Sequence, residues 1–351
     1  MPRPILERES ELATLRAAMR DAHAGHGRVV LVSGEAGIGK SRLVEAACSQ
    51  VPGDARVLVG YCDDLSTPRI LGPFRDLIGS IGAELAAALR TGADRDHVLA
   101  ALRSELQWTG QPTLLAVEDL QWADDATLDV LQYLVRRIAG LPVVALLTYR
   151  DDELPPGHRL RRVLGRTATS GAVRHLPLRR LTPAAVRKAC AGSSVDPDEL
   201  YATTRGNPFF VAEVLASDSI SPVPPTVVDA VLARVHLLEP AARGAVEQLA
   251  VLPTTIEGWL AEEIVDGGLA ALAAAELRGL LTWRAASLAF RHELTRRAIA
   301  DSRPALRRLA LNARVLAALI ANRDADVTRI VHHAAAAGDQ AAIVRYGPVA
   351  A

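Results

Sequence analysis

The chain has 351 residues, of which half are apolar and only 4% aromatic; this length predicts two or three domains, and this composition favours helix-rich packing over sandwiches and barrels. Its 40 basic and 40 acidic residues cancel, which excludes a global field that would draw the protein to nucleic acid or an anionic membrane. The three cysteines lack disulfide or metal-ligand spacing, and without a signal core or long apolar run the sequence predicts a soluble, cytoplasmic protein.

The first part of the chain alternates short apolar runs with helical patterns. A helical pattern reaches about residue 24, and further helices are expected through residues 42–47, across much of 65–110, and over 125–140. Buried strands are expected at 28–33, 55–62, 113–118 and 141–149. This alternation up to about residue 150 predicts a parallel, doubly wound α/β sheet with helices on both faces.

Beyond Asp151 the pattern changes to short helical units. Two of them, 181–192 and 196–216, are followed by a linker at 217–225 and by helices over 226–250. A two-stranded piece is expected around 280–292, and the text from 302 onward is helical and rich in alanine and arginine. The abrupt end suggests the front part of a longer protein.

One glycine-rich stretch matches the phosphate-binding pattern GxxxxGK[ST] in full. It lies between a predicted strand and a predicted helix, which is the context that gives the pattern meaning. Glycines let backbone N–H groups cradle phosphate oxygens, the lysine reaches the β- and γ-phosphates, and the hydroxyl binds Mg²⁺. The alternative is a glycine turn without a ligand. The matching residues are Gly34, Glu35, Ala36, Gly37, Ile38, Gly39, Lys40 and Ser41.

Lys40 is one of only two lysines in the chain; the other is Lys188. A slim ammonium fits between phosphates where a broad guanidinium does not, which explains why an arginine-using chain keeps lysine here.

A second set of polar residues follows two other predicted strands. Glu118 and Asp119 end one of them, where one carboxylate is expected to hold Mg²⁺ through water and its neighbour to orient an attacking water. Asp119 alternatively caps the next segment. Arg150 follows the strand at 141–149 and either senses a γ-phosphate or forms a surface ion pair.

The chain resembles a known family over essentially its whole length. The strings LERESEL, SGEAGIGKSRLV, VEDLQWADDATLDVLQYLVRR, LTYRDDEL, RGNPFFVAEVLA, LAFRHELTRRAI and VHHAAAAGD are similar to the ATPase module of large LuxR-type transcriptional regulators. Those proteins belong to the signal-transduction STAND class of P-loop NTPases, which is related to AAA+ ATPases. A further string, DDLSTPRILGPFRDL, carries the same resemblance.

The resemblance implies an order of parts and a way of working. We expect a nucleotide-binding domain at 1–165, a small helical lid at 166–220, a winged-helix domain at 221–302 and the start of a TPR-like helical region at 303–351. ADP locks the closed form in such proteins, whereas an inducer with ATP opens it for self-association. DNA is contacted only through a C-terminal helix-turn-helix, which this chain lacks.

The resemblance also assigns roles by position. It places Arg8 and Arg42 among the nucleotide-binding positions, Pro208 in the lid near adenine, and His292 at the β-phosphate. Without it, Pro208 is a helix breaker and His292 a structural histidine. Glu118 departs from the aspartate of many relatives, and no arginine finger is evident.

Other charged or aromatic residues have a plain interpretation beside a functional one. Trp122 is a ligand platform or, more simply, packing that anchors its loop. The arginines of 159–166 form a phosphate contact or a solvated helix face. Those of 303–308 contact DNA or belong to a switch domain, and we favour the switch.

The sequence therefore predicts a switch that binds ATP or ADP with Mg²⁺ and hydrolyses ATP slowly, as the regulatory part of a LuxR-type regulator with an unknown inducer. Two rivals remain: a constitutively active ATPase or kinase, and a winged-helix DNA-binding ATPase.

Overall fold

A computed structural model describes residues 5–51, 53, 55–63, 69–107, 111–167, 170–219, 222–253, 255–284, 287–322 and 325–350. The chain divides into two compact units, Met1–Leu181 and Thr182–Ala351. Residues 64–68 of the string DDLSTPRILGPFRDL lie outside the described residues.

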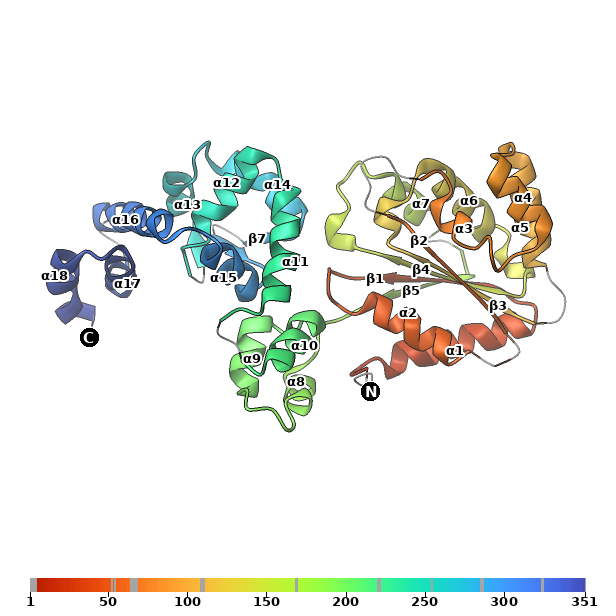
Figure 1. The fold of residues 1–351 in the computed structure, drawn as a ribbon, viewed down its shortest axis with the longest axis horizontal. Coiled ribbons are helices and arrows are strands. Elements are labelled where there is room, and N and C mark those ends of the chain that lie inside the picture. The colour runs from red at the N-terminus through yellow and green to blue at the C-terminus, as the bar shows by residue number, and fades with distance from the viewer. Residues whose placement is uncertain are drawn as a thin grey trace. The chain divides into compact units, whose positions relative to one another are not determined.

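The first unit is built on a five-stranded parallel sheet with the order β2-β3-β4-β1-β5 (Figure 1). The central strands β3 and β4 are buried along their whole length, as their unbroken apolar runs predict. The strands are β1 (Arg28–Ser33), β2 (Arg56–Tyr61), β3 (Thr113–Glu118), β4 (Val143–Tyr149) and β5 (Val173–Pro177).

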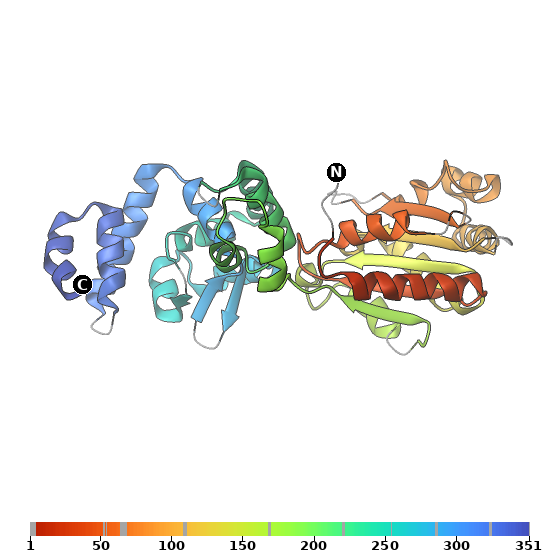
Figure 2. The same ribbon diagram turned by 90° about the horizontal axis from the view of Figure 1, so that it is seen from below.

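Helices cover both faces of this sheet, as predicted. Because successive strand residues point to opposite faces, Val30 and Val32 of β1 pack with one set of helices and Val29 and Leu31 with another. The first set is α1 (Glu9–His23) and α2 (Lys40–Ser49), which lie side by side on one face (Figures 1 and 2). The apolar cluster on the other face contains residues of α4, α5 and α6.

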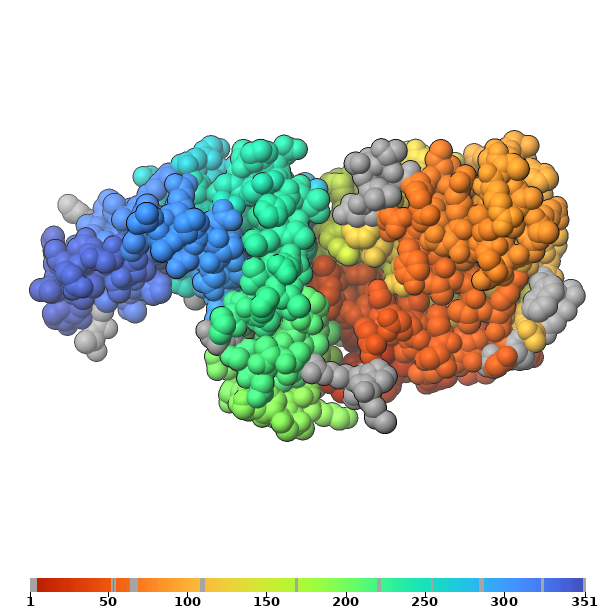
Figure 3. Space-filling view, in the orientation of Figure 1, coloured from red at the N-terminus to blue at the C-terminus, as the bar shows by residue number. Residues whose placement is uncertain are grey.

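The remaining helices of the first unit have between 4 and 12 residues. The helices α4 and α5 pack against each other and form one end of this unit, in orange in Figure 3. The helices are α3 (Gly72–Arg75), α4 (Ala83–Thr91), α5 (Arg95–Leu106), α6 (Asp125–Val135) and α7 (Arg159–Thr167), with single 3₁₀ turns η1 (Leu120–Trp122), η2 (Ile138–Gly140) and η3 (Asp151–Glu153).

The sequence did not predict β5. This strand pairs with β1 only, at the edge of the sheet, and most of its residues are at least partly exposed, so it lacks an apolar run. The boundary expected at residue 165 precedes this strand, which the structure places in the sheet.

The second unit is mostly helical, with one three-stranded antiparallel sheet of order β6-β8-β7. Its helices α8 to α12 each begin with a proline, which suits a first helical residue because its missing N–H has no partner there. The helices are α8 (Pro183–Ala189), α9 (Pro197–Thr204), α10 (Pro208–Ser217), α11 (Pro225–His236), α12 (Pro240–Leu249), α13 (Gly258–Ile264), α14 (Ala273–Leu277), α15 (Glu293–Asp301), α16 (Ala305–Ala321), α17 (Val327–Ala337) and α18 (Gln340–Ala350), with the 3₁₀ turn η4 (Leu269–Leu272).

The predicted two-stranded piece is present as β7 (Leu281–Arg284) and β8 (Ser287–Phe290). A further strand, β6 (Thr255–Glu257), joins them. Residues 285–286 between the hairpin strands and residues 220–221 of the expected linker lie outside the described residues. Within the part of the chain that the structure describes, no helix is long and apolar enough to cross a membrane.

Candidate nucleotide-binding site

The glycine-rich stretch forms the turn from β1 into α2, as predicted. Gly39 immediately precedes α2 with a φ of 99°, a left-handed conformation that glycine adopts without a steric cost. Gly34 has a φ of 151°, and a Cβ there would lie 2.9 Å from Cγ2 of Ile38. The loop therefore requires glycine at both positions, and the amino end of α2 follows directly.

Lys40 is buried inside this loop. Its Nζ donates hydrogen bonds to the carbonyl oxygens of Gly34, at 2.7 Å, and Glu35, at 3.0 Å. Burial lowers the pKa of the ammonium to about 8, and the positive charge of Arg150 acts in the same direction. Both acceptors are neutral carbonyl oxygens, so neither of these two hydrogen bonds gives the ammonium an anionic partner.

Ser41 connects the loop to the acidic end of β3. Its hydroxyl interacts with the Glu118 carboxylate and favours the charged form of that carboxylate; Glu118 is 5% exposed. Burial raises the pKa of the Glu118 carboxyl above its usual range, and the interaction with the Ser41 hydroxyl acts in the opposite direction.

These two oxygen groups fit Mg²⁺, a hard cation that takes oxygen ligands and keeps several waters. Among the described residues no group of three or more His, Cys, Asp or Glu side chains forms a metal cage. A hydroxyl and one carboxylate therefore match an ion whose other ligands are water and substrate phosphates.

Asp119 lies one residue past β3, in a left-handed conformation with a φ of 58°. Its backbone N–H donates to the Thr148 hydroxyl on β4, at 3.0 Å. Its carboxylate accepts a hydrogen bond from the Gln121 amide, at 2.9 Å, and makes no capping bond to η1. The Asp119 side chain therefore does not cap the 3₁₀ turn η1 that follows it.

Arg150 follows β4 and reaches the same place. Its Nε lies 3.6 Å from the Asp119 carboxylate, and its Nη1 donates to Glu153 at 2.9 Å. The guanidinium also lies over the Trp122 ring, 4.6 Å from the centroid, at a distance typical of a cation–π contact. Trp122 also packs against the apolar cluster that contains residues of α4, α5 and α6. Its ring therefore anchors both its own loop and Arg150.

Sequence reasoning missed Gln121, which is 6% exposed. Its Nε2 donates to Asp119 and its Oε1 accepts from the Arg150 backbone N–H, at 3.0 Å. This amide therefore joins the residues that follow β3 and β4. A glutamine in a polar loop carries no pattern that distinguishes it from a solvated one.

Arg8 and Glu35 contact protein groups close to the loop. Arg8 is 4% exposed, and its Nη2 donates to the carbonyl oxygens of Ile38, at 3.2 Å, and Arg179, at 2.7 Å. The Glu35 carboxylate accepts two hydrogen bonds from Arg180, at 2.8 and 2.7 Å. Arg180 was not among the residues singled out in the sequence.

The other loop positions divide into buried and exposed ones. Ile38 is 1% exposed and belongs to the apolar cluster beneath α1 and α2. Ala36 is half-buried, and Gly37 is exposed. Arg42 forms an ion pair with Glu45 on the surface of α2, at 2.9 Å.

Pro208 and His292 belong to the second unit. Pro208 begins α10 after Asn207, whose side chain accepts from the Phe209 N–H. His292 is 4% exposed and packs edge-on against Phe210, with the ring centroids 4.9 Å apart. The structure thus brings the strings GNPFF and FRHEL together within this unit.

The arginine-rich stretches are held in ion pairs and in hydrogen bonds with backbone carbonyls. Arg159 pairs with Asp125 and Asp129 of α6, and Arg161 donates to the Leu154 carbonyl. Arg303 pairs with Glu247 at 2.9 Å. The contacts of Arg159 and Arg161 agree with the interpretation of residues 159–166 as a charged helix face, whereas the switch role of the region around Arg303 stays a prediction.

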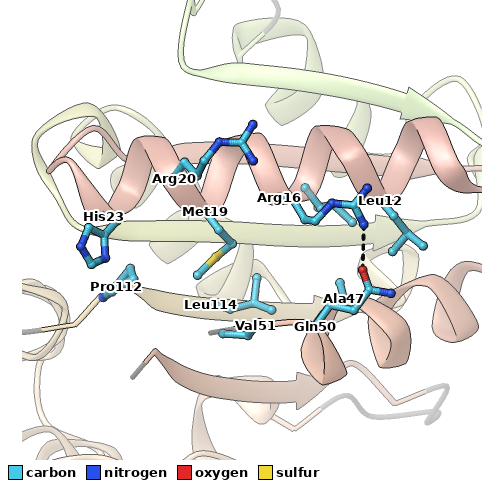
Figure 4. A pocket seen from close by; sticks show the side chains of 11 residues that line it. Leu12, Arg16, Met19, Arg20, His23, Ala47, Gln50, Val51, Pro112 and Leu114 are labelled. Carbon is cyan, nitrogen blue, oxygen red and sulfur yellow. Dashed lines mark hydrogen bonds between the residues drawn. The ribbon is translucent and has the colours of Figure 1, made fainter. Parts of the chain in front are cut away.

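A separate pocket of about 240 Å³ lies between α1, α2 and the start of β3 (Figure 4). Apolar side chains such as Met19 and Leu114 line it, and at its rim Arg16 donates to Gln50 at 2.9 Å. None of the candidate nucleotide-binding residues lines this pocket.

Comparisons with known proteins agree with this geometry. Residues 4–146 match the AAA ATPase domain family. An uncharacterized protein of Rhizobium meliloti is 27% identical over 192 residues, which is 42% of this chain and 19% of that protein. The chain therefore spans about a fifth of the length of the curated relative that it matches.

Solved structures show similarity at low identity. A Walker-type ATPase of Pyrococcus abyssi shares the fold, with a TM-score of 0.55 and 15% identity over 85% of this chain and 99% of that one. A STAND protein with a tetratricopeptide repeat sensor from Pyrococcus horikoshii has a TM-score of 0.41 and 20% identity, over 99% of this chain and 50% of that one. The match over residues 4–146, on a parallel sheet with a complete phosphate-binding loop, supports a P-loop ATPase module of the AAA type in this part of the chain.

Proposed function

We propose that this chain is an ATP/ADP-binding switch of the STAND class, the N-terminal regulatory part of a LuxR-type transcriptional regulator. One observation carries the proposal: Lys40 is buried in the phosphate-binding loop and is held there by carbonyl oxygens of the loop itself. A polyphosphate offers this ammonium anionic acceptors in place of those two neutral carbonyls, and the attraction between opposite charges then adds to the hydrogen bonds.

The residues around the loop then take definite roles. Lys40 binds the β- and γ-phosphates of ATP, while Ser41 and Glu118 hold Mg²⁺, which neutralises charge on those phosphates when bound. Asp119 orients the attacking water, and Arg150 senses the γ-phosphate. The loop residues 34–39 supply backbone N–H groups, and the amino end of α2 adds its dipole.

We expect slow hydrolysis because the side chains of Asp119 and Arg150 are already bound to other protein groups. Asp119 is bound by Gln121, and Arg150 by Glu153 and Trp122. Each must exchange partners before it acts on a water or on a γ-phosphate. Such an exchange suits a protein whose bound nucleotide selects between two states, because only differential binding to the two states can shift their populations.

The second unit supports a switch rather than direct DNA binding. We infer a lid at 166–220, a winged-helix domain at 221–302 and the start of a TPR-like region at 303–351. The succession α12, β6, α13, α14 and the β7–β8 hairpin is the order of elements in a winged helix. Its last helix before the hairpin, α14, contains no basic residue, whereas a helix that reads DNA relies on arginine and lysine.

On this proposal an inducer and ATP favour an open form that self-associates. DNA is contacted through a helix-turn-helix outside this chain.

The test uses nucleotide retained by the purified 351-residue chain. We expect denaturation to release ADP or ATP from the wild type and from Lys188→Ala, which removes the only other lysine, but not from Lys40→Ala. Steady-state turnover should stay well below about 1 s⁻¹, the low end for dedicated enzymes. A chain that neither retains nor binds adenine nucleotide contradicts the proposal.

Two further outcomes identify the rivals. Fast turnover without an inducer indicates a working ATPase or kinase. Sequence-specific DNA binding by this chain alone, measured by gel shift across a salt series, indicates a winged-helix DNA-binding ATPase.

A further inference from the structure

The phosphate-binding loop carries a negative charge of its own. Glu35 follows the first glycine of the loop, and its side chain is only 10% exposed. Its backbone carbonyl also accepts one of the two hydrogen bonds from Lys40, at 3.0 Å. Two like charges a few ångströms apart repel more strongly where water is partly excluded, so this carboxylate opposes the approach of a polyphosphate unless a cation holds it.

Arg180 provides that cation through a two-pronged contact. Its Nε and Nη2 donate to the two carboxylate oxygens of Glu35, at 2.8 and 2.7 Å. This geometry fixes the direction of the carboxylate as well as offsetting its charge. The Arg180 side chain is 31% exposed, so the pair lies at the margin of the loop.

The segment that carries Arg180 is itself fixed beside the loop. The Leu178 N–H donates to the Ser33 carbonyl, at 2.8 Å, directly after the β1–β5 pairing. Arg8 donates to the Arg179 carbonyl at 2.7 Å and to the Ile38 carbonyl of the loop at 3.2 Å. The guanidinium of Arg180 is therefore presented to Glu35 from a backbone that is held at the two preceding residues, Leu178 and Arg179.

We propose that Arg180 is a positioning residue of the phosphate-binding loop, which acts through Glu35 and makes the loop able to accept a nucleoside polyphosphate. This inference rests on the proposed function. Arg180 touches the loop rather than the nucleotide, and its role is to hold and neutralise the carboxylate.

The test separates charge neutralisation from a simple loss of structure. Dissociation constants for ADP and ATP are measured by titration calorimetry on the full chain. We expect Arg180→Ala to weaken binding about tenfold, the size of one lost charge-assisted contact, and the double variant Glu35→Gln/Arg180→Ala to regain most of that loss. Glu35→Gln alone should change affinity by less than about threefold, the scale of a neutral hydrogen bond.

Rescue is the decisive readout, because a purely structural contact predicts that the double variant binds no better than Arg180→Ala. That result overturns the inference, as does an Arg180→Ala affinity equal to that of the wild type. The deficit of Arg180→Ala should also shrink as salt rises, since exposed electrostatic effects are screened. If Arg180→Ala does not fold, Arg180→Gln, which keeps much of the stem, carries the same comparison.

A matched control is Arg28→Ala. Arg28 begins β1, at the opposite end of the strand from the loop, and pairs with Asp21 at 2.8 Å with 26% of its side chain exposed. We expect it to bind nucleotide as the wild type does. If the wild type itself binds neither nucleotide, the proposed function fails and this inference with it; if the wild type binds but rescue is absent, only this inference fails.

Discussion

The Ser41 side chain interacts with the Glu118 carboxylate and lowers its pKa, and this interaction joins the first residues of α2 to the last residue of β3. Ser41 and Glu118 lie 77 positions apart in the sequence. Parallel pairing aligns the carboxyl ends of the strands, so the phosphate-binding loop and the acidic residue meet at one edge of the sheet.

Glu118→Gln tests the metal role of this contact. The amide keeps the shape of the side chain but removes its charge, so we expect single-turnover ATP hydrolysis in Mg²⁺ to fall about 100-fold or more, as for the loss of one catalytic electrostatic group. Affinity for ADP without Mg²⁺ should change little. The control is Glu84→Gln in α4, an exposed acid outside the site. Hydrolysis by Glu118→Gln at the wild-type rate would refute the assignment.

Lys40 gives a pH dependence whose sign follows from burial. Its pKa in the nucleotide-free fold is lowered from 10.5 to about 8, so between those values the unfolded chain binds more protons than the folded one. Stability of the wild type should therefore rise as pH increases from 8 to 10.5, relative to Lys40→Met. The measurement is the difference in thermal midpoint between the two proteins across this range.

Bound nucleotide should remove that difference, because phosphates favour the charged form of the lysine. A wild type and Lys40→Met with parallel pH profiles in the absence of nucleotide contradict the prediction.

Gln121→Glu tests the amide that links Asp119 to Arg150. Glutamate keeps an acceptor for the Arg150 N–H but loses the donor to Asp119 and sets two carboxylates against each other. We expect hydrolysis to fall about tenfold, as for the loss of a hydrogen bond to a charged group, with ADP affinity nearly unchanged. In an Asp119→Asn background the same substitution should have little further effect.

Gln50→Glu is the matched control, because Gln50 is exposed and its side chain accepts a hydrogen bond from Arg16 on the surface. Equal and independent losses from Gln121→Glu in the wild-type and Asp119→Asn backgrounds would show that Gln121 does not act through Asp119.

His333 predicts acid sensitivity of the second unit. It is fully buried in α17, its Nδ1 lies 2.8 Å from Oδ1 of Asn312, and its Nε2 has no hydrogen-bond partner among the described residues. Burial lowers the pKa of this imidazole to about 3, and the charges of His332 and Arg329 act in the same direction. His333 therefore takes up a proton near pH 6.5 in the unfolded chain, whereas in the folded chain it stays neutral down to about pH 3.

Stability should fall by about 2 kcal/mol more in the wild type than in His333→Gln when pH decreases from 7 to 5. Gln keeps a donor for Asn312 and does not titrate. Chemical denaturation at the two pH values measures the difference, and equal losses in both proteins would exclude His333 as the cause.

Much of the first unit was predictable because its determinants are local. The apolar runs at 28–33 and 113–118 became β1 and β3, and the glycine pattern became the turn into α2, since each depends on neighbouring residues. Residue order also placed Glu118 and Arg150 at strand ends, so their meeting with Lys40 at one sheet edge was expected from topology.

The division of the second unit into lid, winged helix and repeat region stays a prediction, as do the roles of Pro208 and His292. Their strings were recognised by resemblance, and the contact of His292 with Phe210 is a packing contact that neither string encodes by itself.

The sequence by itself determined the chemistry at the loop: a glycine cradle, one lysine, one hydroxyl and two acids in fixed order along strands and turns. Only the tertiary structure decided which protein groups hold these residues in place. Arg180 reaches Glu35 across 145 residues of chain, and it does so because β5, an edge strand without an apolar run, pairs with β1. Such a contact depends on which strands pair and in which register. The spacing of residues along the sequence therefore does not predict it.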